Sequence, residues 1–191
     1  MNPKVISQGW AAWTYRLPPA REEIMLYYPG LVPIRQVTDN DFADTSPDLS
    51  WDSVGGKPTL CWQALCGPDG TSEIYTLGPK APLRLTDNDF DDKEPKNWGT
   101  HIVWEGRHDN ADWEIFRYTP SLGVMQLTND ALDDSGPAVS GSRILWAKRD
   151  PEGQYGQETY YFDGFDIARL TENAWMENYH QIDGTHQVWG M

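Results

Sequence analysis

Hydrophobic and polar positions alternate over short runs along the chain, as they do in β-strands that bury one face. The clearest stretch runs from 137 to 176, where we expect strands at 137–140, 143–147, 158–162 and 167–171. Gly141-Ser142 and Asp163-Gly164 stand between neighbouring strands, and Asp-Gly between β-rich runs is a strong hairpin signal. The 3.6-residue periodicity of helices is not seen in the sequence. This stretch therefore predicts a four-stranded antiparallel meander.

The same pattern recurs about every 40 to 50 residues, which is typical of a β-propeller. Each unit closes on a strand-end threonine, at Thr38, Thr86, Thr128 and Thr171. We expect an all-β fold, a small β-propeller in a single domain over 1–191. The four complete four-stranded blades are expected at about 3–46, 47–94, 95–136 and 137–179, and a C-terminal half repeat at 180–191. That half repeat is consistent with a closing clasp, a truncated fifth blade, or a blade completed by a second subunit in a homodimer.

The repeat also resembles a known family. It reads Pro-x-x-Ser-Gly-Ser-x-Ile-Leu-Trp from Pro137, followed by Glu-(Ile/Thr)-Tyr and then x-x-Leu-Thr-x-Asn. This pattern resembles the repeats of TolB-like or WD40-like bacterial β-propeller proteins, over about residues 3–189. The resemblance implies the propeller fold. It does not imply one activity, because that family includes binding, assembly and enzyme-associated roles.

Composition and charge narrow the range of partners. The 191 residues carry a formal net charge of −14, and such an acidic surface repels phosphate backbones, so we expect no nucleic-acid partner. No apolar run reaches the ~18–20 residues of a membrane span, and we expect no membrane partner. The first residues lack the apolar core of a signal peptide, which favours a cytoplasmic location. Cys61 and Cys66 are expected to be free thiols.

Features that recur in every repeat are expected to be scaffold. The expected core tryptophans are Trp13, Trp62, Trp104, Trp146 and Trp189, and the third strands open with Glu23, Glu73, Glu114 and Glu158. An acidic turn follows each closing threonine. Asp and Asn at alternate positions there either close the turns with backbone hydrogen bonds, which their recurrence favours, or bind calcium. The candidate calcium ligands are Asp39, Asp41, Asp87, Asp89 and Asp92.

Positions that depart from the repeat are the candidates for ligand binding. Aromatic rings beside arginine or acidic groups suit a sugar or a peptide, through stacking and bidentate hydrogen bonds. An insertion over 51–56 carries one such ring, and loops near 107–113 and 175–180 carry others. The candidate residues are Trp51, Trp98, Arg107, His108, Asp109, Trp113, Trp175 and Tyr179.

Sequence motifs for nucleophilic, phosphate or zinc-protease chemistry are missing from the chain. We therefore expect a noncatalytic β-propeller module that presents variable loops to a protein or glycan ligand. One alternative is an enzyme with a small-molecule site at the propeller axis or a dimer seam, assisted by calcium. Another alternative is a propeller lectin. No cofactor is expected apart from that possible calcium.

Overall fold

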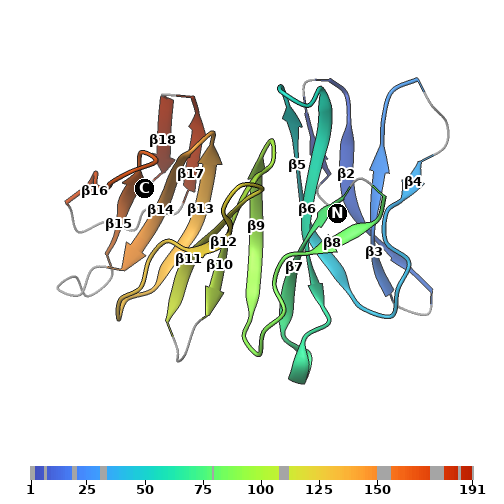
Figure 1. Ribbon diagram of the computed structural model, residues 1–191, viewed down its shortest axis with the longest axis horizontal. Helices are drawn as coiled ribbons and strands as arrows, with labels where there is room; N and C mark the ends of the chain where they lie inside the picture. The colour runs from blue at the N-terminus through green and yellow to red at the C-terminus, as the bar shows by residue number, and fades with distance from the viewer. Residues whose placement is uncertain are drawn as a thin grey trace. The chain divides into compact units, whose positions relative to one another are not determined.

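The computed structural model describes residues 3–6, 8–18, 21–30, 34–78, 80–107, 112–149, 156–172, 179–184 and 186–190. Pro68, Tyr179 and Trp189 are described by their backbone only. The described residues form β-strands and one 3₁₀ turn, η1 (Pro68–Gly70). Four sheets have four antiparallel strands each, in chain order, and a fifth sheet has two strands (Figure 1). The expectation of an all-β propeller with four four-stranded blades and a C-terminal half repeat is confirmed.

The strands of the first two sheets are β1 (Lys4–Val5), β2 (Ala11–Leu17), β3 (Arg21–Tyr27) and β4 (Arg35–Gln36), then β5 (Asp44–Asp52), β6 (Lys57–Leu65), β7 (Ser72–Leu77) and β8 (Pro82–Arg84). The next two contain β9 (Asp92–Trp98), β10 (His101–Arg107), β11 (Trp113–Thr119) and β12 (Gly123–Gln126), then β13 (Asp134–Ser140), β14 (Arg143–Arg149), β15 (Gln157–Phe162) and β16 (Ile167–Arg169). The last sheet pairs β17 (Tyr179–Asp183) with β18 (His186–Gly190).

The chain divides into two compact units, Met1–Thr100 and His101–Met191, and the division falls in the turn after β9. The expectation of one domain over 1–191 stays a prediction. Each unit has its own apolar core between two neighbouring sheets. The first core contains Ala12, Ile24, Leu26, Leu49, Leu60 and Trp62. The second contains Val103, Ile115, Val139, Ile144, Trp146 and Phe162.

A β-bulge shapes the first strand of the second and fourth blades, and the third blade has the same backbone turn before its proline. The residue before its proline has a positive φ in each case, at Ser46 (49°), Glu94 (51°) and Gly136 (62°). The pairing register shifts at the bulge in β5 and in β13. Pairing nevertheless continues beyond it, so β13 begins at Asp134, three residues before its predicted start. This backbone geometry therefore carries each first strand past a proline that has no N–H to donate.

The recurring tryptophans confirm most of the predicted core, with one correction. Trp62, Trp104 and Trp146 are at most 1% exposed. Trp13 is only half-buried. The side chain of Trp189 lies outside the described residues.

Two further observations bear on the expectations. Cys61 and Cys66 are free thiols. None of the described residues forms a helix long and apolar enough to cross a membrane.

Candidate functional site

A pocket of about 240 Å³ lies in the second unit, at the end of the sheets where β10 and β14 begin. Its walls come from β10, β11, β13 and β14, and from the turns that follow β11, β13 and β15. Buried apolar side chains contribute Ile102, Val103, Val139 and Ile144. The polar lining includes His101, Arg117, Thr119, Ser121 and Ser142. The pocket therefore combines an apolar interior with hydrogen-bonding groups.

His101 is fixed at the pocket by the turn of the neighbouring sheet. Its Nδ1 lies 2.5 Å from the carbonyl oxygen of Gly141. A carbonyl oxygen only accepts hydrogen bonds, so Nδ1 carries the proton and Nε2 is left as an acceptor. Gly141 has a φ of 64°, which suits glycine, and no atom lies within 4 Å of where its Cβ would be. The turn thus leaves open space beside an oriented imidazole ring.

Arg117 brings a positive charge to the pocket wall. Its guanidinium carbon lies 4.8 Å from the centre of the Phe162 ring, and Nη2 lies 3.9 Å from Met125 Sδ. Among the described residues, no carboxylate forms an ion pair with this guanidinium. The carboxylate of Asp163, the residue after Phe162, accepts the backbone N–H groups of its own turn, which lower its pKa. The half-buried Arg117 side chain therefore retains its charge-assisted donors for another group.

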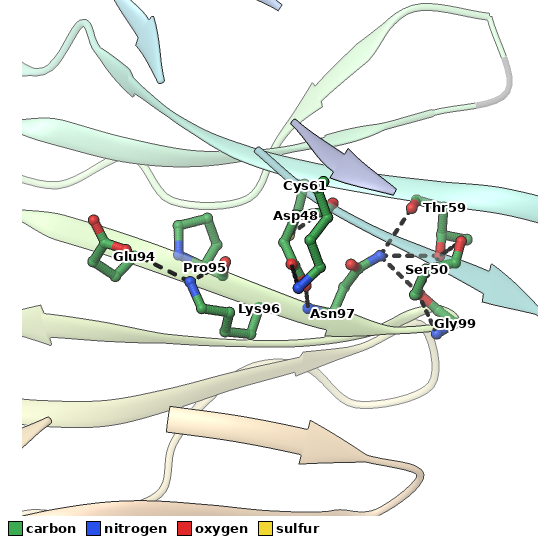
Figure 2. Close-up of polar contacts among 10 residues, drawn as sticks. Asp48, Ser50, Thr59, Cys61, Glu94, Pro95, Lys96, Asn97 and Gly99 are labelled. Carbon is green, nitrogen blue, oxygen red and sulfur yellow. Dashed lines mark hydrogen bonds and ion pairs between the residues drawn. The ribbon is translucent and has the colours of Figure 1, made fainter. Parts of the chain in front are cut away.

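The matching position in the first unit is closed by polar contacts (Figure 2). Asn97 stands where the pocket has Val139, and Thr59 where it has His101. Asn97 Nδ2 donates to the carbonyl and hydroxyl oxygens of Thr59, both at 3.0 Å. The Asn97 N–H donates to Asp48 Oδ2 at 2.8 Å, and Asp48 pairs with Lys4 at 2.8 Å. The repeat therefore has two different structures at this position. Hydrogen bonds join the strands in the first unit, and a pocket lies between them in the second.

The thiol nearest this polar network is not a nucleophile. Cys61 is fully buried, and its Sγ lies 3.8 Å from the carbonyl oxygen of Asp48. Burial first, and then the charge of Asp48, raise the pKa of the Cys61 thiol well above its ordinary value. Because the thiolate is the reactive form, Cys61 is a packing residue.

The glutamates that open the third strands belong to a repeated scaffold contact. In the third blade, Thr128 Oγ1 donates to Glu114 Oε2 at 2.6 Å and accepts the Ile115 N–H at 2.9 Å. The Thr38–Glu23 and Thr171–Glu158 pairs have the same 2.6 Å bond. Thr86 likewise accepts the Ile74 N–H, while Glu73 pairs with Arg84. These contacts join the third strand of a blade to the segment that leaves its fourth strand.

In the second and fourth blades, the acid six residues after the preceding threonine binds the tryptophan of the blade that it begins. Asp44 Oδ1 accepts the Trp62 indole N–H at 2.8 Å, and Asp134 Oδ1 accepts that of Trp146 at 2.8 Å. Each of these bonds lies within the sheet that the aspartate begins. Burial is the largest cause of a raised pKa at both carboxyls, to about 7 for Asp134.

The acidic turns use their side chains in local contacts. Asn40 Oδ1 accepts the N–H two residues ahead, and Asn88 and Asp130 do the same. Of the candidate calcium ligands, Asp41 pairs with Arg21, Asp87 pairs with Arg84, and Asp92 is buried and accepts from Asn88. Asp39 and Asp89 are exposed. The part of the chain that the structure describes holds no group of three or more His, Cys, Asp or Glu arranged for a metal. Calcium binding stays a prediction.

Of the eight predicted ligand residues, the structure brings two together. The Arg107 guanidinium carbon lies 4.6 Å from the centre of the Trp113 ring, at the end of β10 opposite to the pocket. Trp98 ends β9 and is 43% exposed, and Trp51 lies in β5 opposite Pro58. Tyr179 begins β17, and its side chain is not described. His108, Asp109 and Trp175 lie outside the described residues.

Sequence reasoning did not select His101, Arg117 or Ser142 as ligand-binding residues. A signal for Arg117 was present, since it stands three residues after its blade's glutamate. The same position in the other repeats holds Leu26, Thr76 and Tyr161.

Comparison with known proteins supports the fold. No protein-family model matches this chain, and no curated protein matches it. Among solved structures, a putative TolB from Agrobacterium tumefaciens is 18% identical with a TM-score of 0.61, covering 89% of this chain and 64% of that one. TolB from Acinetobacter baumannii is 18% identical with a TM-score of 0.56, covering 85% and 40%. The β-propeller domain of the Trilobed protease from Pyrococcus furiosus is 12% identical with a TM-score of 0.63, covering 89% and 52%.

These similarities confirm the resemblance to TolB-like β-propellers. At such identities they establish the fold alone. This chain spans less than two thirds of the length of each of the three structures.

Proposed function

We propose that this β-propeller is a noncatalytic binding module and that a peptide segment of a partner protein occupies the pocket beside His101. The observation that carries the proposal is the pocket itself, a hollow of about 240 Å³ with an apolar interior and polar lining groups. Binding sites commonly combine a mostly apolar concave surface with a few placed polar groups. The corresponding position in the first unit supports the proposal. Asn97 and Thr59 are hydrogen-bonded there, so the repeat does not by itself require a pocket.

The scaffold roles of the reactive groups support a binding function over an enzymatic one. The blade glutamates are engaged by threonine hydroxyls or by arginine, and Cys61 is held as a thiol. General acid–base chemistry needs a titratable group within reach of a substrate, whereas these groups hold strands together.

The shape and lining of the pocket favour a peptide. Its volume lies below the roughly 300–1,000 Å³ of sites for drug-sized ligands, so it suits one or two side chains of a longer chain. Solved structures with this fold include acylaminoacyl peptidase from Pyrococcus horikoshii and the propeller domain of a protease, proteins named for action on peptides and proteins. A glycan is the second candidate, because Trp98 is 43% exposed and an exposed indole can stack on a sugar.

A peptide array tests the proposal when it is probed with the wild-type chain and with Ser121→Trp, which places an indole at the exposed pocket edge. The matched control is Lys80→Trp, an exposed position in the corresponding turn of the second blade. We expect peptides that bind the wild type and the control and lose binding to Ser121→Trp. Mass spectrometry of the bound peptides should find them intact. Binding that Ser121→Trp leaves unchanged would refute the pocket, and cleaved peptides would refute a noncatalytic role.

A further inference from the structure

We infer that the pocket recognises the free carboxyl terminus of a peptide, with the terminal carboxylate on Arg117. This inference rests on the proposed function and specifies its ligand class. The terminal residue would place a small apolar side chain against Val139 and Ile144, which are 9% and 2% exposed. Its amide N–H would donate to His101 Nε2. A chain terminus supplies these three features within one residue.

The charge balance is the first argument. The protein has 29 acidic and 15 basic residues, and three of its arginines form an ion pair with a carboxylate among the described residues. Arg21, Arg84 and Arg169 each pair with one. Arg117 instead lies over Phe162 with no ion pair among the described residues, in the wall of a pocket. Guanidinium groups bind carboxylates by two parallel hydrogen bonds, so a terminal carboxylate matches this vacancy in charge and shape.

The orientation of His101 is the second argument. Because Nδ1–H donates to the Gly141 carbonyl, Nε2 is the acceptor in this tautomer of the ring, and no described residue hydrogen-bonds to it. A ligand with two carboxylates, or a phosphate, brings only hydrogen-bond acceptors when it is fully ionised. Such a ligand suits the arginine but not the acceptor on the histidine. It suits a ligand that carries an acceptor anion and a donor N–H together, as the last residue of a peptide does.

The internal repeat is the third argument. At the position of Arg117, the first two blades have Leu26 and Thr76. Leu26 is 3% exposed in the core, and Thr76 donates to the Leu60 carbonyl at 3.0 Å. An arginine there adds a charge that the other repeats do not have at this position. Arg117 therefore departs from the repeat on β11, in the same blade as His101 on β10, whose position is also held by a histidine, His186, in the C-terminal half repeat.

Calorimetric titration tests the inference with three probes: acetyl-Ala-Ala-Leu as the free acid, the same peptide as its C-terminal amide, and 4-methylpentanoate. We expect the acid to bind at least about tenfold more tightly than the amide, the size expected for one charge-assisted contact. The small carboxylate should bind more weakly than the acid because it lacks the amide N–H. Equal or tighter binding of 4-methylpentanoate would show a site for free carboxylates and overturn the assignment to a peptide terminus.

Variants connect the preference to the named residues. Arg117→Met should reduce binding of the acid to the level of the amide, whereas the exposed control Arg35→Met should leave both unchanged. Acid and amide that bind equally, and that both lose binding to Ser121→Trp, would overturn the carboxylate inference and leave the proposed function standing. If none of the probes binds while array peptides still bind through the pocket, the inference fails alone. If the array peptides also fail, the proposed function fails with it.

Discussion

Replacing Lys148 with alanine should lower the free energy of unfolding by about 2–3 kcal/mol at pH 8. Lys148 lies on β14 directly opposite Asp134 on β13. Its Nζ pairs with Asp130 and lies 3.8 Å from Asp134 Oδ2. Breaking a buried ion pair costs about 3–5 kcal/mol. The loss should be smaller here because Asp130 is 41% exposed and Asp134 keeps its hydrogen bond from Trp146.

The first unit shows how the loss can be reversed. Asp44 begins β5 as Asp134 begins β13. The residue opposite Asp44 is Ala64 rather than a lysine, and Asn40 Nδ2 donates to Asp44 Oδ2 at 2.7 Å. In the first unit a neutral amide contacts the buried carboxylate, whereas in the second unit a lysine paired with another carboxylate lies beside it. Adding Asp130→Asn to Lys148→Ala copies that neutral arrangement. The double variant should recover most of the stability, with a coupling of about 2 kcal/mol between the two changes.

The pH dependence follows from the pKa of Asp134, which burial raises to about 7 from about 4 in an unfolded chain. The folded state then binds a proton that the unfolded state releases, so this contribution is full below about pH 4 and is lost as the pH rises through about 7. Without Lys148 the pKa of Asp134 should rise further. Urea unfolding should therefore show a larger loss for Lys148→Ala at pH 8 than at pH 5. Equal losses at the two pH values, or no recovery on adding Asp130→Asn, would refute the reasoning.

Three further predictions concern the scaffold. Thr128→Val should cost about 2–4 kcal/mol in urea unfolding, because it leaves Glu114 and the Ile115 N–H without their shared hydroxyl; a loss below about 0.5 kcal/mol would contradict that role. Trp62→Phe should cost about 1–3 kcal/mol, since it removes the bond to Asp44 and leaves a cavity, and a melting temperature equal to that of the wild type would count against it. Exhaustive chelation followed by 1 mM calcium should leave the melting temperature unchanged, because the acidic turns satisfy their own polar groups. This concentration reaches the upper end of the dissociation constants of extracellular calcium modules, about 10⁻⁴–10⁻³ M. A clear rise in the melting temperature on adding calcium would contradict this expectation and support calcium binding.

Much of the scaffold was predictable because the chain repeats it. The contact of Thr128 with Glu114, and the burial of Trp62 and Trp146, follow from residues that each repeat contains, although the spacing from the glutamate to the threonine varies from 13 to 15 residues. Order along the repeat, more than exact offset, therefore predicts these contacts. Trp13 is the exception among the described tryptophans of this pattern, because it recurs in the sequence but is only half-buried.

The pocket was less predictable because it depends on contacts between sheets. His101 and Gly141 are 40 residues apart, and their contact requires the turn after β13 to lie beside the start of β10. Attention to exposed aromatic loops drew the sequence analysis toward Arg107 and Trp113, at the other end of β10. Arg117 was the more useful departure, since it places a charge where other repeats place Leu, Thr or Tyr.

The most direct test is a titration of the isotope-labelled protein with acetyl-Ala-Ala-Leu free acid, followed by backbone amide NMR. We predict that the shifts which move will cluster at 101–103, 117–119 and 141–144, where His101 and Arg117 line the pocket. The Arg117→Met variant should lose these changes. Shifts confined to residues 1–100, or changes that Arg117→Met preserves, would contradict the assignment of the ligand site to this pocket.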